Sequence, residues 1–305
     1  MIAFGASISS AEAYRRYAEP GIRRAAEPDS AILAFASLEP IGRAYNLVLD
    51  AAAAHGDLEA LVLVAPHTEI ADPELCAKIR AALADPEVAV LGVAGATGVR
   101  SIAWWEGTVT AAKGIRRYVE HGGGELPAFG WTDHRPPPAD VTTVDGDLLV
   151  LSPWAVRNLR FDETLILGYG FDLDFCLQAG AAGRKVRVID VAVVHHRSVE
   201  LISDLAVWVE AHIRTAEKWQ AVIGPRTEVQ ADWKRRARQA EARREVARTV
   251  AFSKALLIDA RVLEAERALQ ERTATLSWRL TAPLRALNHR RREAARRPAP
   301  GGSPP

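Results

Sequence analysis

The chain reads ALVLVA at residues 60–65 and continues as PHTE at residues 66–69. A short apolar run that stops at a proline and polar residues is typical of a strand buried on both faces of a sheet. Polar residues at the carboxyl end of such a strand lie where doubly wound sheets bind their ligands. This stretch therefore predicts a buried sheet and the edge of it that carries a site.

Similar apolar runs alternate with segments of helical period on both sides of this stretch. The runs lie at residues 2–8, 31–36 and 88–94, and the helical segments at residues 10–26, 41–55 and 73–84. This alternation predicts an α/β fold, in which helices cover both faces of a mostly parallel sheet.

The second half of the chain departs from this regular alternation. Clusters of Trp, Gly and Pro in residues 95–138 favour irregular loops over a site. A strand at residues 148–151, a helix at 172–182 and a strand at 185–194 return to the sheet, and the pattern is mostly helical beyond Leu201. The long segment 229–272 is typical of an amphipathic or coiled helix, but it lacks clean heptads over its length.

Charge divides the chain near Gly224-Pro225. Residues 1–224 hold 20 basic and 29 acidic residues, a net charge of −9, whereas residues 225–305 hold 19 basic and 9 acidic residues, a net charge of +10. We therefore predict a domain at 1–224, a basic helical extension at 225–297 and a disordered tail at 298–305.

The composition favours a reducing, cytoplasmic location. The two cysteines, Cys76 and Cys176, sit in helical patterns and suggest neither a disulfide framework nor a zinc cluster. We expect no secretory signal in the first ten residues and no spanning helix.

Polar residues follow the predicted strands at the edge where a ligand would bind. Ser7 and Ile8 follow the first strand, Ser37 and Glu39 the second, and His67 and Glu69 the third. They suit contacts to a base, a ribose, a phosphate or a metal, and simple turn chemistry explains the first two pairs equally well.

Two aspartates and two histidines occupy corresponding places later in the chain. Asp172 and Asp174 begin a helix, where a carboxylate either caps the helix or acts as a general base. His195-His196 ends the next strand pattern and supplies imidazole, a ligand for Mn or Zn.

Taken in order, these motifs resemble the family 2 glycosyltransferases over most of residues 1–200. The resemblance rests on Tyr45-Asn46, Leu61–Ile70, Val144-Asp145-Gly146, Phe161-Asp162-Glu163, Gly170–Asp174 and Val194-His195-His196. It implies a GT-A, Rossmann-like domain that transfers a sugar from a nucleoside diphosphate, with inversion. Asp172 falls at the family's catalytic base, beside Asp174. Ser7, Ile8, Ser37, Glu39, His67, Glu69, Asp145 and Gly146 would then line the donor site.

The chain departs from the family at its Asp-x-Asp motif. Ala65-Pro66-His67 stands there, and Phe171 replaces an acidic residue before the base. Either His67, Glu69 and His195 hold Mn or Mg in an altered way, or metal dependence is weakened or lost.

The basic tail suggests a partner. Residues 275–285 resemble a C-terminal segment of bacterial cell-surface glycosyltransferases, which implies a surface-glycan or lipid-linked acceptor, cell wall biogenesis and a peripheral position at the inner face of the plasma membrane. A solvated helix packed on its own domain, or one that binds a partner protein, explains the segment equally well. No recognition module points to nucleic acid.

Three function classes follow from these patterns. The leading one is the glycosyltransferase, and Trp104-Trp105 either lines its sugar pocket or packs under a loop. The second is a catalytically degraded GT-A domain that binds glycan or nucleotide, or acts as a scaffold. A nucleotidyltransferase is disfavoured, because no glycine-rich loop with a lysine follows the first strand.

Overall fold

The computed structural model describes residues 1–36, 41–118, 125–127, 137–165, 168–196, 204–223 and 231–274. The fold is α/β, as the alternating pattern predicts. A seven-stranded sheet forms its centre, in the order β10-β13-β5-β12-β3-β1-β2. These strands are β10 (Ala139–Val141), β13 (Lys185–Val188), β5 (Val88–Gly92), β12 (Leu148–Leu151), β3 (Ala60–Val64), β1 (Ile2–Ile8) and β2 (Ile32–Ala36).

The sheet is mostly parallel. β2, β1, β3, β5 and β13 run in one direction, and β12 and β10 run against them. Antiparallel β12 lies between β3 and β5, so that its beginning meets the end of β3. This reversal places the loop before β12 at the carboxyl edge of the parallel strands.

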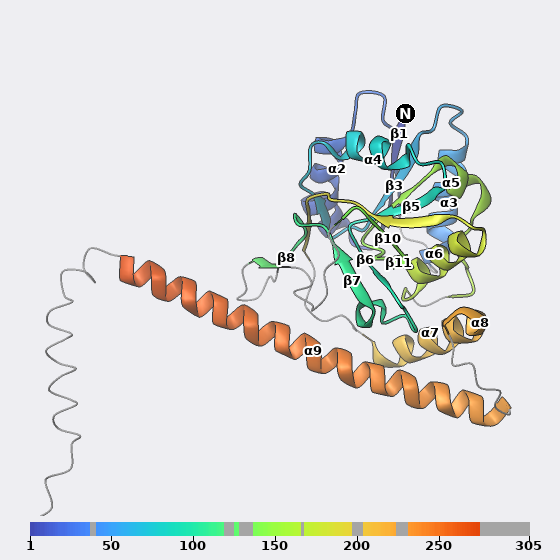
Figure 1. Cartoon of the computed structure of the whole chain (residues 1–305). Coiled ribbons are helices and arrows are strands. Elements are labelled where there is room, and N and C mark those ends of the chain that lie inside the picture. Colours follow the sequence, from blue (N-terminus) through green and yellow to red (C-terminus); the bar gives the residue numbers. More distant parts are fainter. Residues whose placement is uncertain are drawn as a thin grey trace, which may run out of the picture.

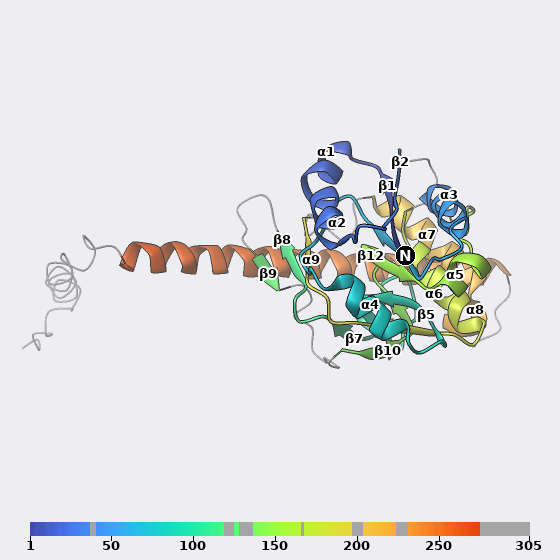
Figure 2. The same cartoon turned by 90° about the horizontal axis from the view of Figure 1, so that it is seen from above.

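Helices cover both faces of the sheet (Figure 1, Figure 2). Successive side chains along a strand point to opposite faces, so each strand contributes to an apolar core on either side. Val62 and Val64 of β3 belong to the apolar core under α2 and α4, whereas Leu61 and Leu63 belong to the core under the other helices. The first face carries α2 (Glu19–Ala25) and α4 (Leu75–Leu83). The second carries α3 (Ile41–Ala53), α5 (Pro153–Asn158) and α6 (Phe171–Ala181).

Two small sheets extend the domain beyond the carboxyl edge. One has the order β11-β6-β7 and the other β4-β14-β8-β9. Their strands are β6 (Ala94–Thr97), β7 (Thr108–Ala111), β11 (Thr143–Val144), β4 (Thr68–Ile70), β8 (Arg116–Tyr118), β9 (Glu125–Pro127) and β14 (Val193–His195).

These small sheets correct two predictions. The segment expected to be irregular contains β6, β7, β8 and β9, whose short runs between glycines give no clear strand period. The single strand expected at 185–194 is two strands in different sheets, β13 and β14, separated by a break at residues 189–192.

The other described α-helices are α1 (Ala11–Ala13), α7 (Leu205–Lys218), α8 (Gln220–Ile223) and α9 (Ala231–Ala274). A π-helical segment at Tyr14–Ala18 joins α1 to α2, and a 3-10 turn spans Trp104–Glu106. The long helix predicted at 229–272 is therefore confirmed as α9. Its first half packs against α7, and its second half extends past the domain (Figure 1). No helix within the described ranges has the length and apolarity needed to cross a membrane.

Candidate active site

The carboxyl ends of β1 and β3 meet the loop that leads into β12. The Ala65 amide donates to the carbonyl of Asp147 at 3.0 Å, which extends the β3–β12 pairing by one step. The chain then turns at Pro66, and His67 lies beside the Asp147 side chain. Backbone pairing between neighbouring strands thus brings together two residues that are 80 positions apart in sequence.

Asp147 connects two histidines. Its Oδ1 lies 3.1 Å from His67 Nε2, and its Oδ2 lies 2.8 Å from His195 Nδ1. Burial alone would raise the pKa of Asp147, but the two imidazoles hold it well below its usual range. His195 is fully buried, whereas the His67 side chain keeps 23% of its exposure. Asp147 is thus an anion that fixes both rings and leaves His67 at the open side.

Buried polar atoms without a hydrogen-bond partner gather on the same edge. Ser7 Oγ, Thr68 Oγ1 and His195 Nε2 are buried and have no partner among the described residues. Thr68 pairs with His195 in the β4–β14 register, and Ser7 is near the end of β1. An unsatisfied buried polar atom costs about 1–3 kcal/mol, so a group of them is more typical of a binding site than of a finished core.

Asp172 lies next to this edge, in the first turn of α6. Its Oδ2 accepts a hydrogen bond from the Gly146 amide at 3.0 Å, and its Oδ1 accepts one from its neighbour Leu173 at 2.8 Å. Burial, helped by the charge of Asp145, raises the pKa of the Asp172 carboxyl to about 7. A half-buried carboxyl that titrates near neutral pH can accept a proton at the pH of the cell.

Gly146 allows Asp172 to approach the loop before β12 closely. A Cβ at this position would lie 2.6 Å from Phe171 Cζ and 3.2 Å from Asp172 Cβ. A side chain here would have to displace the Phe171 ring and press on Asp172, so glycine lets the loop before β12 pack close to the start of α6. Gly146 thus contacts Asp172 through its amide, whereas Asp145 accepts from the Asp147 amide at 2.9 Å and acts on Asp172 through its charge. Their place in the donor site stays a prediction.

Tyr45 closes the other side of this group from α3. It is 2% exposed, and its ring packs on Phe161 and Phe171 at 5.1 and 5.8 Å between centroids. Burial raises the pKa of Tyr45, and the nearby charges of Asp147 and Asp172 raise it further, so the phenol keeps its proton.

The structure joins two of the motifs on which the resemblance rests. Asn46 donates to the carbonyl of Phe161 at 2.9 Å and accepts from its amide at 2.9 Å, and it also donates to Glu163 at 3.1 Å. Tyr45-Asn46 and Phe161-Asp162-Glu163 are therefore one unit that sets α3 against the segment before α6.

Asp174 has a different role from Asp172. Its buried carboxylate receives Lys218 Nζ at 2.6 Å, Trp219 Nε1 at 2.7 Å and Gln178 Nε2 at 2.8 Å. Two residues along a helix turn a side chain to the opposite face, which points Asp174 at α7. The expectation of a shared catalytic role is therefore corrected: Asp174 fastens α6 to α7.

Of the three residues expected to bind a metal, His67 and His195 meet at Asp147, and Glu69 has other partners. Glu69 pairs with His196 Nε2 at 2.9 Å and Arg24 Nη1 at 3.3 Å, and Tyr17 stacks on His196 with 3.8 Å between ring centroids. Alternation along β4 explains this, because Thr68 faces His195 and Glu69 must face the other side. In the described part of the chain, no three His, Cys, Asp or Glu side chains form a metal-binding group.

The remaining predicted residues have mixed outcomes. Ile8 lies at the end of β1 and packs against the core, and Ser37 and Glu39 lie outside the described residues. Trp104 is buried and meets Trp105 edge to face at 6.0 Å, which agrees with packing under a loop. Asp147 was missed, although the second acid of Asp145-Gly146-Asp147 directly before a buried strand was a signal for it.

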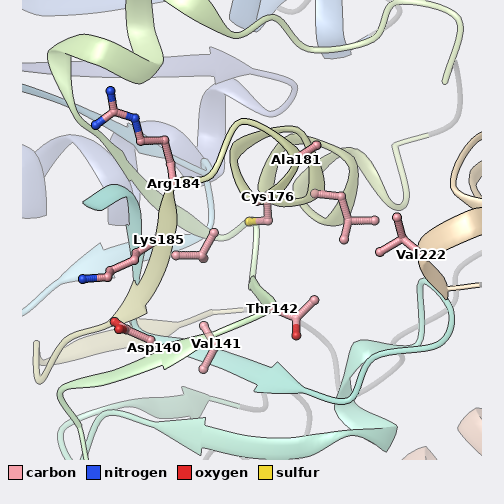
Figure 3. Close-up of a pocket in the computed structure, with 11 residues that line it drawn as sticks. Asp140, Val141, Thr142, Cys176, Ala181, Arg184, Lys185 and Val222 are labelled. Atoms are coloured by element: carbon pink, nitrogen blue, oxygen red, sulfur yellow. The ribbon is translucent and has the colours of Figure 1, made fainter. Parts of the chain in front are cut away.

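A separate cavity of about 440 Å³ lies between α6, β13 and α8 and contains none of the predicted site residues (Figure 3). Arg184 and Lys185 at its rim already have partners, namely the carbonyl of Pro86 and the carboxylates of Asp85 and Glu87. The Asp147–Asp172 region is therefore the better candidate for an active site.

Comparison with known proteins gives one related sequence and several similar structures. No family model matches the chain. The streptomycin biosynthesis protein StrF of Streptomyces griseus is 27% identical over 217 residues, which is 70% of this chain and 73% of that protein.

Similar structures include nucleotide-sugar glycosyltransferases. The mannosyltransferase PcManGT from Pyrobaculum calidifontis, in complex with GDP-Man and Mn²⁺, has a TM-score of 0.43 at 13% identity and covers 93% of this chain and 83% of its own. GalNAc-T7 with UDP, GalNAc and Mn²⁺ has a TM-score of 0.45 at 10% identity over 73% of this chain, which spans 48% of that one. TarS of S. aureus has a TM-score of 0.44 at 13% identity over 76% and 68% of the two chains.

Proposed function

We propose that this protein is a GT-A glycosyltransferase that moves a sugar from a nucleoside diphosphate donor to an acceptor hydroxyl. The observation that carries the proposal is Asp172, a half-buried carboxyl whose pKa is raised to about 7 at the edge where β1 and β3 end. The sequence motifs around it resemble those of family 2. A surface glycan or a lipid-linked sugar is the proposed acceptor, in keeping with the tail segment.

The proposed reaction is a single displacement with inversion. Asp172 takes the proton of the acceptor hydroxyl while the oxygen of that hydroxyl bonds to the anomeric carbon of the donor sugar. The bond between the anomeric carbon and the diphosphate breaks at the same time, and its electron pair leaves with the diphosphate. The Gly146 amide, which donates to Asp172 Oδ2, orients the carboxylate. A base works best when its pKa lies near the working pH, which fits a value of about 7.

The donor is proposed to bind where β1 and β3 end. Ser7 supplies a buried hydroxyl without a partner among the described residues, and His67 keeps an exposed part of its ring at the same edge. Asp147 holds that ring in place. His67 is therefore the residue proposed to line the donor site at this edge.

The residues expected to bind a metal already contact other side chains. Two of the similar proteins hold Mn²⁺, but here His67 and His195 contact Asp147, and Glu69 contacts His196. The expected set His67, Glu69 and His195 does not fit a cation as it stands, so the reaction above contains no metal step.

The missing acidic residues also favour a second candidate, a degraded GT-A domain that binds nucleotide or glycan without turning it over. The two candidates differ in one measurable respect, the release of nucleoside diphosphate. The raised pKa of Asp172 supports the enzyme, because carboxyls with strongly raised pKa values cluster at catalytic sites.

The proposal is tested by incubating the full chain with a panel of UDP-, GDP- and dTDP-sugars and measuring nucleoside diphosphate release. Water replaces the acceptor in this assay, so the acceptor need not be known. We expect release from one donor class and a loss of about 100-fold or more in Asp172→Asn. No release from any donor, or equal release by folded Asp172→Asn, contradicts the proposal.

A further inference from the structure

The second half of α9 presents an apolar stripe that the rest of the described chain does not cover. Residues 261–271 of the helix are all exposed (Figure 1). Ile258, Val262 and Leu269 keep 61%, 50% and 57% of their surface. Soluble monomers rarely expose large aliphatic side chains in a row, and such rows mark interaction surfaces.

The stripe has the period of a coiled coil. Ala255, Val262 and Leu269 are seven residues apart, as are Ala251, Ile258 and Ala265, and the two sets interleave at spacings of three and four. They correspond to the a and d positions of a heptad. We call these six residues the 251–269 seam.

The seam faces away from the domain. The f positions of the same heptads lie on the opposite side of the helix, and two of them, Ser253 and Ala260, are 8% and 3% exposed. The seam residues themselves are all exposed. A partner can therefore occupy the seam without displacing α9 from the domain.

The structure also explains why heptads are hard to see in the whole sequence of α9. Within residues 238–250, the buried residues are Arg238, Ala242, Glu245 and Thr249, which form a partly polar face against the domain. Only beyond residue 250 does the apolar pattern belong to a side that the domain leaves open.

The charges beside the seam indicate what the partner is. Lys254 and Arg261 occupy g positions, and Asp259 and Glu266 occupy e positions; all four are exposed and make no ion pair within the described ranges. In a parallel pair of helices, each g residue faces the e residue five positions on in the other helix. Lys254 then meets Asp259, and Arg261 meets Glu266, in both directions across the pair.

Other partners fit these charges less well. An antiparallel pair brings e to e and g to g, which sets Asp259 and Glu266 against acids and Lys254 and Arg261 against bases. An anionic membrane gains little from these charges, because Asp259 and Glu266 on one flank of the seam offset the attraction of Lys254 and Arg261 on the other. We propose that the 251–269 seam joins two copies of this chain as a parallel coiled coil.

The mass of the full chain in solution tests the proposal. We expect light scattering after gel filtration to give a dimer at micromolar concentration and Val262→Lys to give a monomer with unchanged helix content. Leu257→Lys is the matched control, because Leu257 is 42% exposed on the same stretch of α9 but lies at a c position. A monomeric wild type, or a dimer that Val262→Lys leaves intact, overturns the proposal.

A second pair of variants tests the parallel register. Leu269→Cys should form an interchain disulfide under mild oxidation, because equal a positions meet across a parallel pair, and Leu257→Cys should not. The native cysteines are buried and do not compete.

Reversing the charges beside the seam tests the same register. Arg261→Glu should weaken the dimer, and the double variant Arg261→Glu with Glu266→Arg should restore it. A failure of the restoring pair, or binding of a monomeric chain to anionic vesicles through the seam, contradicts the proposal.

Discussion

At the residue scale, the surroundings of Asp172 raise the pKa of its carboxyl towards neutral pH. Burial disfavours its charged form, and Asp145 adds like-charge repulsion, while the Gly146 and Leu173 amides partly offset both. The balance raises the pKa to about 7.

This balance predicts the pH dependence of the reaction. Asp172 must be ionised to accept a proton, so kcat/KM for donor turnover should rise with pH through about 7. Asp145→Asn removes the repelling charge and should move the midpoint of that rise to lower pH. A midpoint that Asp145→Asn leaves in place contradicts the assignment of Asp172 as the base.

The same shift predicts an effect on stability. A carboxyl whose pKa is higher in the folded than in the unfolded state binds more protons when folded, so stability falls as pH rises from about 4 to about 7. At pH 8, Asp172→Asn should therefore raise the free energy of unfolding, by about 1–3 kcal/mol. Urea unfolding of both proteins measures this gain, which should shrink as the pH is lowered towards 4.

Sequence reasoning located part of this site. Ser7, His67, Asp172 and His195 were expected at one edge of a sheet because they follow strands or begin a helix, and the structure places them near that edge, while their roles stay predictions. Two partnerships were not predictable: His67 and His195 meet on Asp147, and Glu69 turns to His196. These depend on which side of β4 and β14 each side chain occupies, and the pairing of two three-residue strands leaves no periodic signal.

At the scale of elements, α6 and α7 are held together by the buried carboxylate of Asp174. Lys218 and Trp219 at the end of α7 both contact its Oδ1, and Lys218 also reaches Asp162 at 2.6 Å. Burial would raise the pKa of Asp162, but the hydrogen bond from Lys218 helps to lower that pKa to about 2.

Removing this carboxylate should be costly. Asp174→Ala removes a buried carboxylate that accepts hydrogen bonds from Trp219 and Gln178 and pairs with Lys218, so we expect a loss of about 1–3 kcal/mol in the free energy of unfolding. Asp50→Ala is the control, because its pair with Arg160 is exposed and is worth at most about 1 kcal/mol. Equal losses in urea unfolding would contradict the structural role given to Asp174.

Elements were predicted well where the hydrophobic period was long. The sheet strands at 60–65 and 88–94, the helix at 172–182 and the helix at 229–272 were found with small errors at their ends. The short strands β6, β7, β8 and β9 were missed, because their hydrogen bonds come from pairing across the chain and not from local pattern.

At the scale of the whole molecule, the change of charge near Gly224-Pro225 does not coincide with a boundary in the packing. Ala242 of α9 lies in the same apolar core as Trp208 and Ala211 of α7, and His212 reaches Glu241 at 3.8 Å. The helical extension thus shares a core with the domain, even though its composition differs.

This packing predicts different outcomes for two truncations. A chain ending at residue 223 exposes the α7 face and should lose solubility or show a lower melting temperature. A chain ending at residue 253 keeps the packed half of α9 and should melt like the full chain at concentrations where the full chain is monomeric. Equal melting temperatures for the two truncated chains would contradict this prediction, because the packing of α9 on α7 would then not stabilise the domain.

The central claim is that the edge around Asp172 binds a nucleotide-linked sugar. Calorimetric titration of the full chain with UDP, GDP and dTDP, each with and without Mn²⁺, tests it most directly, because it needs neither the sugar nor the acceptor. We predict that one of the three binds, and the change on adding Mn²⁺ measures how far a cation takes part. No binding of any of the three to folded protein, in either condition, contradicts the claim.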